Sequence, residues 1–132
     1  MHRAVWPLDR GRPVVAVVLL MAEGEQFCTR MLLADTGAGS AQSGFDLILQ
    51  ETDCLRCGGI PSMPVQLSGA WAGRFPTYIL RVQLPALAFD RHLRVVGVSK
   101  VPLELEGIAC FSFLNRFNSG NFGDPGLFGL ET

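Results

Sequence analysis

The sequence runs Leu32-Leu33-Ala34-Asp35-Thr36-Gly37-Ala38-Gly39-Ser40, an apolar segment that leads one aspartate into a turn flanked by glycines. We expect a buried strand to end at Asp35, whose carboxylate then needs hydrogen-bond donors. Gly37 and Gly39 carry no side chain and let the backbone fold back until N–H groups face that carboxylate. Asp and Gly also dominate ordinary turns, so the tripeptide alone fits a structural turn as well as a catalytic loop.

Length and charge limit the classes of function. A chain of 132 residues suffices for one domain, and we expect an N-terminal arm over residues 1–12 and a domain over 13–132. A formal charge of −1 argues against a nucleic-acid surface. The longest apolar run, residues 14–22, is shorter than the roughly 20 residues of a membrane-spanning helix, so no membrane partner is expected. The first residues lack the apolar core of a secretory signal, which favours a cytoplasmic location.

Short apolar and β-branched runs separated by turn residues predict strands along most of the chain. We expect these strands at residues 13–21, 26–34, 45–49, 63–68, 76–84, 92–98, 107–110 and 127–131. The apolar spacing in residues 111–117 predicts one short helix packed on the core, and residues 51–61 and 118–126 are expected to be loops. The predicted class is therefore all-β, a small closed barrel or folded sheet with one late helix.

The cysteines raise the alternative of a metal or redox module. Cys54 and Cys57 have the spacing of half a zinc site or of a redox pair. No second Cys-x-x-Cys follows, His2 and His92 stand alone, and the residues from Gly58 onward are expected to prevent the helix that a redox motif opens. We therefore predict no metal and no cofactor, and interpret these cysteines as loop thiols, or as a small-loop disulfide if the compartment is oxidising.

Nucleotide binding and catalysis by a Ser or Cys nucleophile are not supported, because each lacks a required residue or context. Gln42 stands where a dinucleotide fingerprint needs its third glycine, and Phe45 where a phosphate-binding loop needs lysine. Neither histidine lies in a context that suits a base for a Ser or Cys nucleophile. A carboxylate mechanism remains, but it requires both an acid and a base, and no second Asp-Thr-Gly occurs in the chain. We therefore expect a homodimer in which two copies of Asp35 share one proton.

Three features together resemble the retropepsins, the single-domain retroviral-type aspartic proteases, and in particular their bacterial relatives. They are the segment 32–38, the predicted hairpin with its tip at residues 69–73, and the apolar segment 108–114 before the predicted helix. The resemblance covers roughly residues 13–132, nearly the whole chain. It implies an acid-protease barrel that dimerises through its chain ends and cleaves extended peptides.

The resemblance also implies roles for individual residues. Asp35 would be catalytic, Thr36 would cross-bond the two loops, and Gly37 and Ala38 would complete the active-site loop. The hairpin tip would be a flap over the substrate, formed by Gly69, Ala70, Trp71, Ala72 and Gly73. The cleft wall would include Ser99, Val101 and Pro102, and the loop would be braced by Ile108, Cys110 and Ser112.

One segment departs from the family pattern. The retropepsins usually have Gly, any residue and then Asp or Asn where this chain has Cys110-Phe111-Ser112. Gly39 and Ser40 also follow Ala38 where many relatives have Ser or Asp directly. Because the first segment braces the catalytic loop, a catalytically silent dimer that binds peptide segments stays open as the alternative to an active protease.

Overall fold

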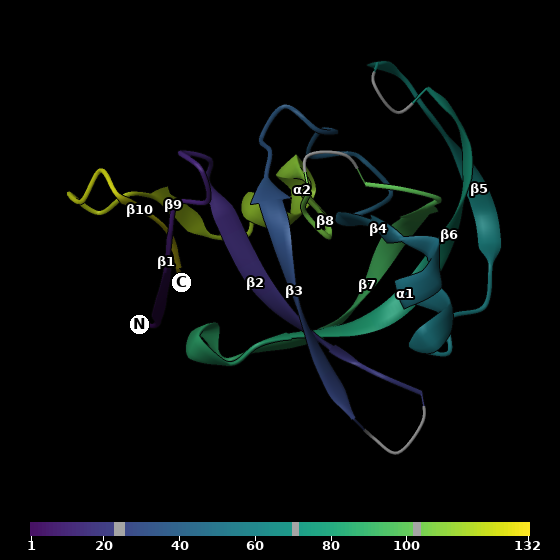
Figure 1. Cartoon of the computed structure of the whole chain (residues 1–132), viewed down its shortest axis with the longest axis horizontal. Helices are drawn as coiled ribbons and strands as arrows, with labels where there is room; N and C mark the ends of the chain where they lie inside the picture. The colour runs from purple at the N-terminus through teal and green to yellow at the C-terminus, as the bar shows by residue number, and fades with distance from the viewer. Residues whose placement is uncertain (23–25, 70–71, 102–103) are drawn as a thin grey trace.

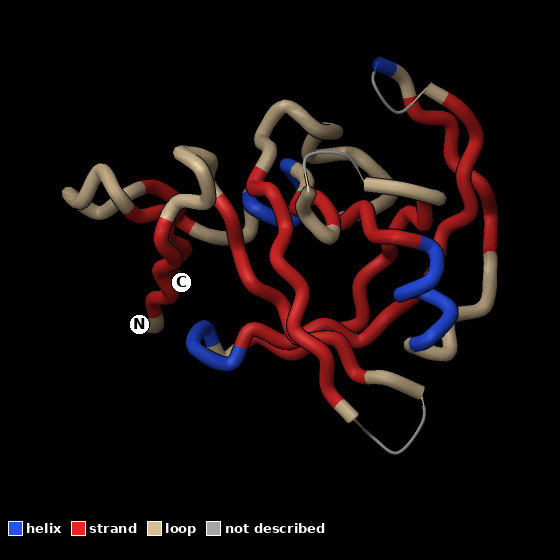
Figure 2. The backbone as a smooth tube through the Cα atoms, viewed as in Figure 1, coloured by secondary structure: helices blue, strands red, loops and turns tan. Residues whose placement is uncertain are grey.

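The computed structural model of the 132-residue chain describes residues 1–22, 26–69, 72–101 and 104–132. Strands make up most of the described residues, and the helices are short (Figure 2). In chain order the elements are β1 (Arg3–Pro7), β2 (Val14–Leu20), β3 (Phe27–Ala34), β4 (Leu47–Gln50), α1 (Glu51–Arg56), β5 (Ser62–Leu67), β6 (Gly73–Leu84), η2 (Pro85–Leu87), β7 (Phe89–Val98), β8 (Gly107–Ala109), α2 (Phe111–Leu114), β9 (Asn118–Gly120) and β10 (Leu127–Glu131).

Within the described residues, six strands close a barrel in the order β2-β3-β8-β4-β7-β6, with β6 pairing back to β2 (Figure 1). The barrel is mixed, because β3 pairs with β8 and β4 with β7 in parallel, while the other neighbours are antiparallel. Strand β5 continues the sheet beyond β6 as the outer arm of a hairpin. The all-β class and the closed barrel are confirmed.

Two apolar clusters fill the fold. The larger one lies inside the barrel and includes fully buried residues of β2, β4 and β6. A second cluster, on the opposite face of the sheet, is formed by Ile48, Val96, Val98, Val101, Ile108 and Cys110. Three side chains of the β5–β6 hairpin, Val65, Leu67 and Phe75, pack against this second cluster. The hairpin is therefore held over the sheet by apolar contacts.

The two ends of the chain pair with each other. Strand β1 runs antiparallel to β10, with Ala4 opposite Leu130, and β9 adds a third strand to this small sheet. The N- and C-termini accordingly lie close together (Figure 1), and the Thr132 N–H donates to the His2 carbonyl at 3.0 Å. Within the predicted N-terminal arm, residues 3–7 are therefore ordered by strand pairing with β10.

The largest error concerns residues 51–56, which form helix α1 rather than a loop. Glu51 and Asp53 lie in its first turn and Arg56 in its last, which suits the helix dipole. Gly58, at φ +75°, lies just after the helix, and its N–H donates to the Leu55 carbonyl at 2.9 Å. The glycine therefore ends the helix instead of preventing it.

Two smaller differences lie near the C-terminus. Helix α2 covers Phe111–Leu114, a single turn instead of the two expected over residues 111–117. Strand β9, within the segment expected to be a loop, pairs with β10. No helix in the described parts of the chain is long and apolar enough to cross a membrane.

Helix α1 is fixed to the barrel by polar contacts. Arg30 of β3 donates to both carboxylate oxygens of Asp53, from Nε at 2.8 Å and from Nη2 at 3.0 Å. The Tyr78 hydroxyl donates to Glu51 at 2.8 Å. Because Asp53 and Tyr78 are buried, these bonds position α1 against β3 and β6.

Buried thiols predict a loss of stability at alkaline pH. Burial raises the pKa of Cys54 and Cys110 from 9.0 to about 12 and that of Cys57 to about 11. When the pH rises above 9, the unfolded chain releases these protons while the folded chain keeps them, so the free energy of unfolding falls until the folded pKa values are reached. Urea titrations at pH 7, 9, 10 and 11 should show this decline, and a smaller one in Cys54→Ala. An unfolding free energy that stays constant between pH 9 and 11 would contradict the prediction.

Candidate active site

Asp35 follows the last residue of β3 and lies in a tight turn. Its backbone N–H donates to the Ala109 carbonyl at 3.0 Å, which ties the turn to β8. Its Oδ1 accepts the Gly37 N–H at 2.9 Å, and its carbonyl accepts the Ala38 N–H at 3.1 Å. A Cβ at position 37 would lie 3.2 Å from that Oδ1, so glycine suits the close approach. Residues 35–39 are called the Asp35 loop below.

Gly39 has a different part in this loop from the one expected. Its φ of +77° lies in the left-handed region, where a residue with a side chain is strained. The bond to the Asp35 carboxylate comes from Gly37, whereas Gly39 turns the chain toward residues 40–43. There the Ser40 N–H donates to Ser43 Oγ at 2.7 Å, and the Ser43 N–H donates to the Ser40 carbonyl at 3.1 Å.

The segment after β8 lies directly behind the Asp35 loop. The Phe111 N–H donates to the Ala38 carbonyl at 2.8 Å. Cys110 is fully buried in the second cluster, against which Ala38 packs. Ile108 pairs with Leu33 on one side and with Ile48 on the other. These contacts are of the kind needed to hold the loop from behind, although the bracing roles of Ile108, Cys110 and Ser112 remain predictions.

Cys110 is a packed thiol, not a reactive one. Burial raises its pKa to about 12, with smaller contributions from the charges of Asp35 and Asp46. A thiol with this pKa carries almost no negative charge at neutral pH and is a poor nucleophile. Cys110 therefore adds almost no charge near Asp35.

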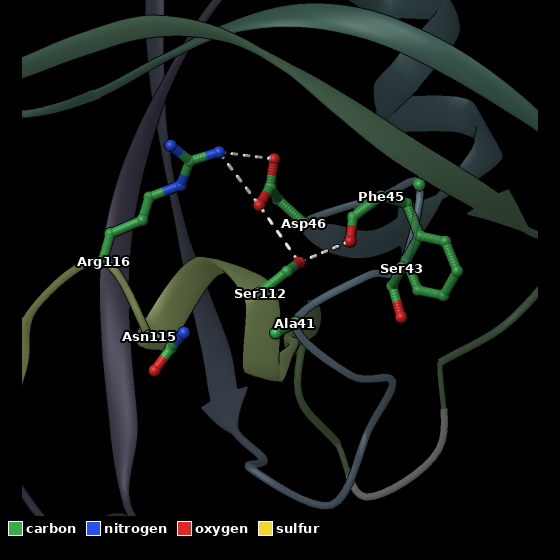
Figure 3. Close-up of a pocket in the computed structure, with 8 residues that line it drawn as sticks. Ala41, Ser43, Phe45, Asp46, Ser112, Asn115 and Arg116 are labelled. Atoms are coloured by element: carbon green, nitrogen blue, oxygen red, sulfur yellow. Dashed lines mark hydrogen bonds and ion pairs between the residues drawn. The ribbon is translucent and has the colours of Figure 1, made fainter.

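Asp46 lies just before β4 and contacts residues at the start of α2. It was not among the candidate residues. Its backbone N–H donates to the Arg94 carbonyl at 2.9 Å and its carbonyl accepts the Cys110 N–H at 3.0 Å. Ser112 Oγ lies 3.1 Å from Asp46 Oδ1 and donates to the Phe45 carbonyl at 2.6 Å. Arg116 completes the group through Nη2, at 3.2 and 3.1 Å from the two carboxylate oxygens (Figure 3).

A cleft of about 480 Å³ separates the Asp35 loop from the β5–β6 hairpin. The end of β3 and the end of β5 lie at the same end of the barrel (Figure 1). Asp35 is the sole ionisable residue in the described lining of this cleft. The remaining lining residues are Gly37, Ala38, Gly39, Ser43, Phe45, Ile48, Gln66, Leu67, Ser68 and Gly69. The described lining of the cleft is therefore largely uncharged, with one carboxylate.

Of the other candidate residues, some line the cleft, some do not, and some lie outside the described residues. The Thr36 side chain is exposed and makes no hydrogen bond with the described residues. Gly69, at φ +71°, lines the cleft, and its carbonyl accepts the Ala72 N–H at 3.2 Å. Gly73 begins β6. Ala70 and Trp71 lie outside the described residues, so the predicted tip of the flap is not described in full.

The predicted cleft wall is not part of the described lining. Ser99 is exposed, and Val101 is 5% exposed and points into the second cluster. Pro102 lies outside the described residues. The cavity next to Asp35 is instead lined by Ser43, Phe45 and Ile48, which were not candidates. A signal for Ile48 was present, because it lies on a predicted strand that follows the Asp35 loop.

The described residues contain no cluster of three or more His, Cys, Asp or Glu side chains that could hold a metal ion. Cys54 and Cys57 lie at the end of α1, and both are free thiols. Cys54 is buried, and Cys57 lies 3.9 Å from the Met21 sulfur. Their place in the fold is that of core and near-core side chains.

Comparison with known proteins places the fold. No protein-family model matches the chain, and no curated protein matches it by sequence. Among solved structures it resembles the crystal structure of a retropepsin-like aspartic protease from Rickettsia conorii, with a TM-score of 0.60 and 16% sequence identity. The match covers 97% of this chain and 89% of the other. The chain therefore has the retropepsin-like fold.

Proposed function

We propose that the protein is an aspartic endopeptidase that acts as a homodimer on extended peptide segments. The observation that carries the proposal is the position of Asp35. Its carboxylate is held by the Gly37 N–H at 2.9 Å and lines a cleft of about 480 Å³ beside the β5–β6 hairpin. The resemblance in fold to a bacterial retropepsin-like protease supports the same assignment.

The proposed chemistry needs a second subunit. Hydrolysis of a peptide bond by carboxylates requires one group to take a proton from water and another to protonate the scissile carbonyl. No described hydrogen bond or ion pair joins Asp35 to a second acidic side chain, so one subunit holds half of this pair. A twofold axis next to the Asp35 loop would supply the other half, and two adjacent carboxylates would retain one shared proton.

Other parts of the site have corresponding roles in the proposal. The exposed Thr36 would bond to the partner's loop across the axis. The β5–β6 hairpin would act as a flap that closes over the substrate and excludes water. The sheet of β1, β10 and β9 would contribute to the dimer contact at the chain ends.

A catalytically silent peptide-binding dimer is the second candidate. The observation that favours it is Cys110-Phe111-Ser112, because in this chain the Ser112 hydroxyl contacts Phe45 and Asp46 where the retropepsins usually have an Asp or Asn side chain. Such a protein would keep the cleft and the dimer but lack the geometry for turnover.

A peptide-cleavage assay from pH 4 to 7 separates the two candidates. The purified protein is incubated with a diverse peptide library, with and without a pepstatin-like inhibitor, and products are identified by mass spectrometry. The proposal expects internal cleavage that the inhibitor blocks. Peptide binding without cleavage at every pH would support the silent dimer, and cleavage that resists the inhibitor would contradict an aspartic mechanism.

A further inference from the structure

A second cavity, of about 410 Å³, lies beside the cleft that contains Asp35. We call it the Arg116 pocket. It is lined by Ala41, Ser43, Gly44, Phe45, Asp46, Ser112, Asn115 and Arg116 (Figure 3). Ser43 and Phe45 line both cavities, so a single stretch of chain separates them. A peptide in the cleft could therefore extend a side chain or an end into the Arg116 pocket.

The pocket contains a guanidinium group with donors to spare. Arg116 contacts Asp46 through Nη2 alone, and that nitrogen is shared between the two carboxylate oxygens at 3.2 and 3.1 Å. In Figure 3 Nη1 lies on the side of the guanidinium opposite Asp46. Nε and Nη1 make no hydrogen bond with any described residue. Because guanidinium binds carboxylates through several N–H groups, this side of Arg116 suits a second carboxylate.

Neighbouring polar groups add to this chemistry. The Asn115 side-chain amide makes no hydrogen bond with the described residues and lines the same pocket as Arg116. Ser43 Oγ accepts the Ser40 N–H at 2.7 Å and keeps its own hydrogen to donate. Asp46 is the one acidic group in the described lining, and Arg116 and Ser112 already contact its carboxylate.

We infer that the Arg116 pocket binds a carboxylate of the substrate peptide, either an Asp or Glu side chain or the C-terminal carboxylate. This rests on the proposed function, because it assigns the carboxylate to a peptide bound in the cleft beside Asp35. Arg116 would provide the charge and Asn115 a neutral donor. The pocket would then make cleavage selective for peptides with a carboxylate at a fixed distance from the scissile bond.

Binding is tested without cleavage, on the Asp35→Asn protein, by NMR titration with three small probes. N-acetylglutamate methylamide carries a side-chain carboxylate, N-acetylglutamine carries a terminal one, and N-acetylglutamine methylamide carries none. We expect saturable shifts at the Gly44 and Asn115 amides with the first or the second probe, which identifies the source of the carboxylate. Equal shifts with the third probe, or none with any probe, would overturn the inference.

Variants separate a binding role from a structural one. Arg116→Gln and Asn115→Ala should both lower the affinity for the carboxylate probe. For Arg116→Gln we expect a loss of at least about tenfold, as for a lost charge-assisted hydrogen bond. Arg81→Gln is the matched control, since it breaks an exposed Arg–Asp pair outside the pocket, with its atoms 2.7 Å apart. The Asn115 side chain makes no hydrogen bond with the described residues, so Asn115→Ala keeps the test valid if Arg116→Gln unfolds. Unchanged probe affinity in Asn115→Ala and in a folded Arg116→Gln would contradict the inference.

The peptide-library assay distinguishes this inference from the proposed function. Wild-type cleavage without any preference for carboxylates, together with absent probe binding, would overturn the pocket assignment and leave the protease assignment intact. Probe binding in a protein that cleaves no peptide would support the pocket and overturn the protease assignment. Cleavage with a carboxylate preference that disappears in Arg116→Gln but persists in Arg81→Gln would support both.

Discussion

The Asp35→Asn protein should fold and dimerise like the wild type and lose at least about 10³-fold of its peptide-cleaving rate, within the range that general acid–base groups contribute. Asparagine keeps the size of the side chain and can still accept the Gly37 N–H, which now lies 2.9 Å from Asp35 Oδ1. It cannot take a proton from water, and both halves of the site lose this ability at once. The measurement is the initial rate of cleavage of a peptide found in the library screen.

Asp124→Asn is the control for Asp35→Asn. Asp124 is exposed, lies in the turn before β10 and lines none of the cavities next to Asp35, so its substitution should leave the rate unchanged. Size-exclusion chromatography and circular dichroism establish that both variants fold and assemble. Cleavage by Asp35→Asn at the wild-type rate would contradict the proposed mechanism.

The Asp53→Ala variant should lose about 3 kcal/mol of unfolding free energy, the lower end of the range for breaking a buried ion pair from one side. Asp53 has 8% of its side chain exposed and Arg30 has 17%, so the substitution leaves a poorly solvated guanidinium. Glu106 lies 3.4 Å from Arg30 Nε, so Arg30 still has one acidic neighbour in the variant. The expected loss is therefore at the lower end of that range. Urea denaturation of both proteins gives the difference.

Asp90→Ala is the matched control for Asp53→Ala. Asp90 also receives two hydrogen bonds from an arginine, Arg81, at 2.9 and 2.7 Å, but both side chains are exposed. Water then solvates the arginine that is left, and the loss of stability should be small. A loss in Asp53→Ala no larger than that in Asp90→Ala would show that burial of the Arg30 pair does not stabilise the fold.

The sequence predicted the elements whose pattern is local. Short apolar and β-branched runs identified β2 and β3, which pair along their whole length from Val14 with Leu33 to Leu20 with Phe27. Alternation of apolar and polar residues over 76–84 identified the returning strand of the β5–β6 hairpin. Helix α1 was missed because its glycines, read as helix breakers, in fact lie just after its last residue.

The parts of the site that depend on contacts between residues far apart in the chain could not be predicted from the sequence. Asp46 and Arg116 are 70 residues apart, and their pairing depends on how α2 packs against the start of β4. Neither residue belongs to a motif, so nothing in the sequence singled them out. Strand β9 was missed for a similar reason, because its pairing with β10 defines it and its own residues, Asn118, Ser119 and Gly120, are typical of turns.

A crystal structure of the assembled protein tests the central claim most directly, through the distance between the carboxyl oxygens of Asp35 in one subunit and of Asp35 in its partner. The account predicts a twofold dimer with the two groups about 2.5 to 3.0 Å apart, as for carboxyl groups that share a proton. A protein that is monomeric in solution, and whose Asp35 faces no second carboxylate in the crystal, would contradict it.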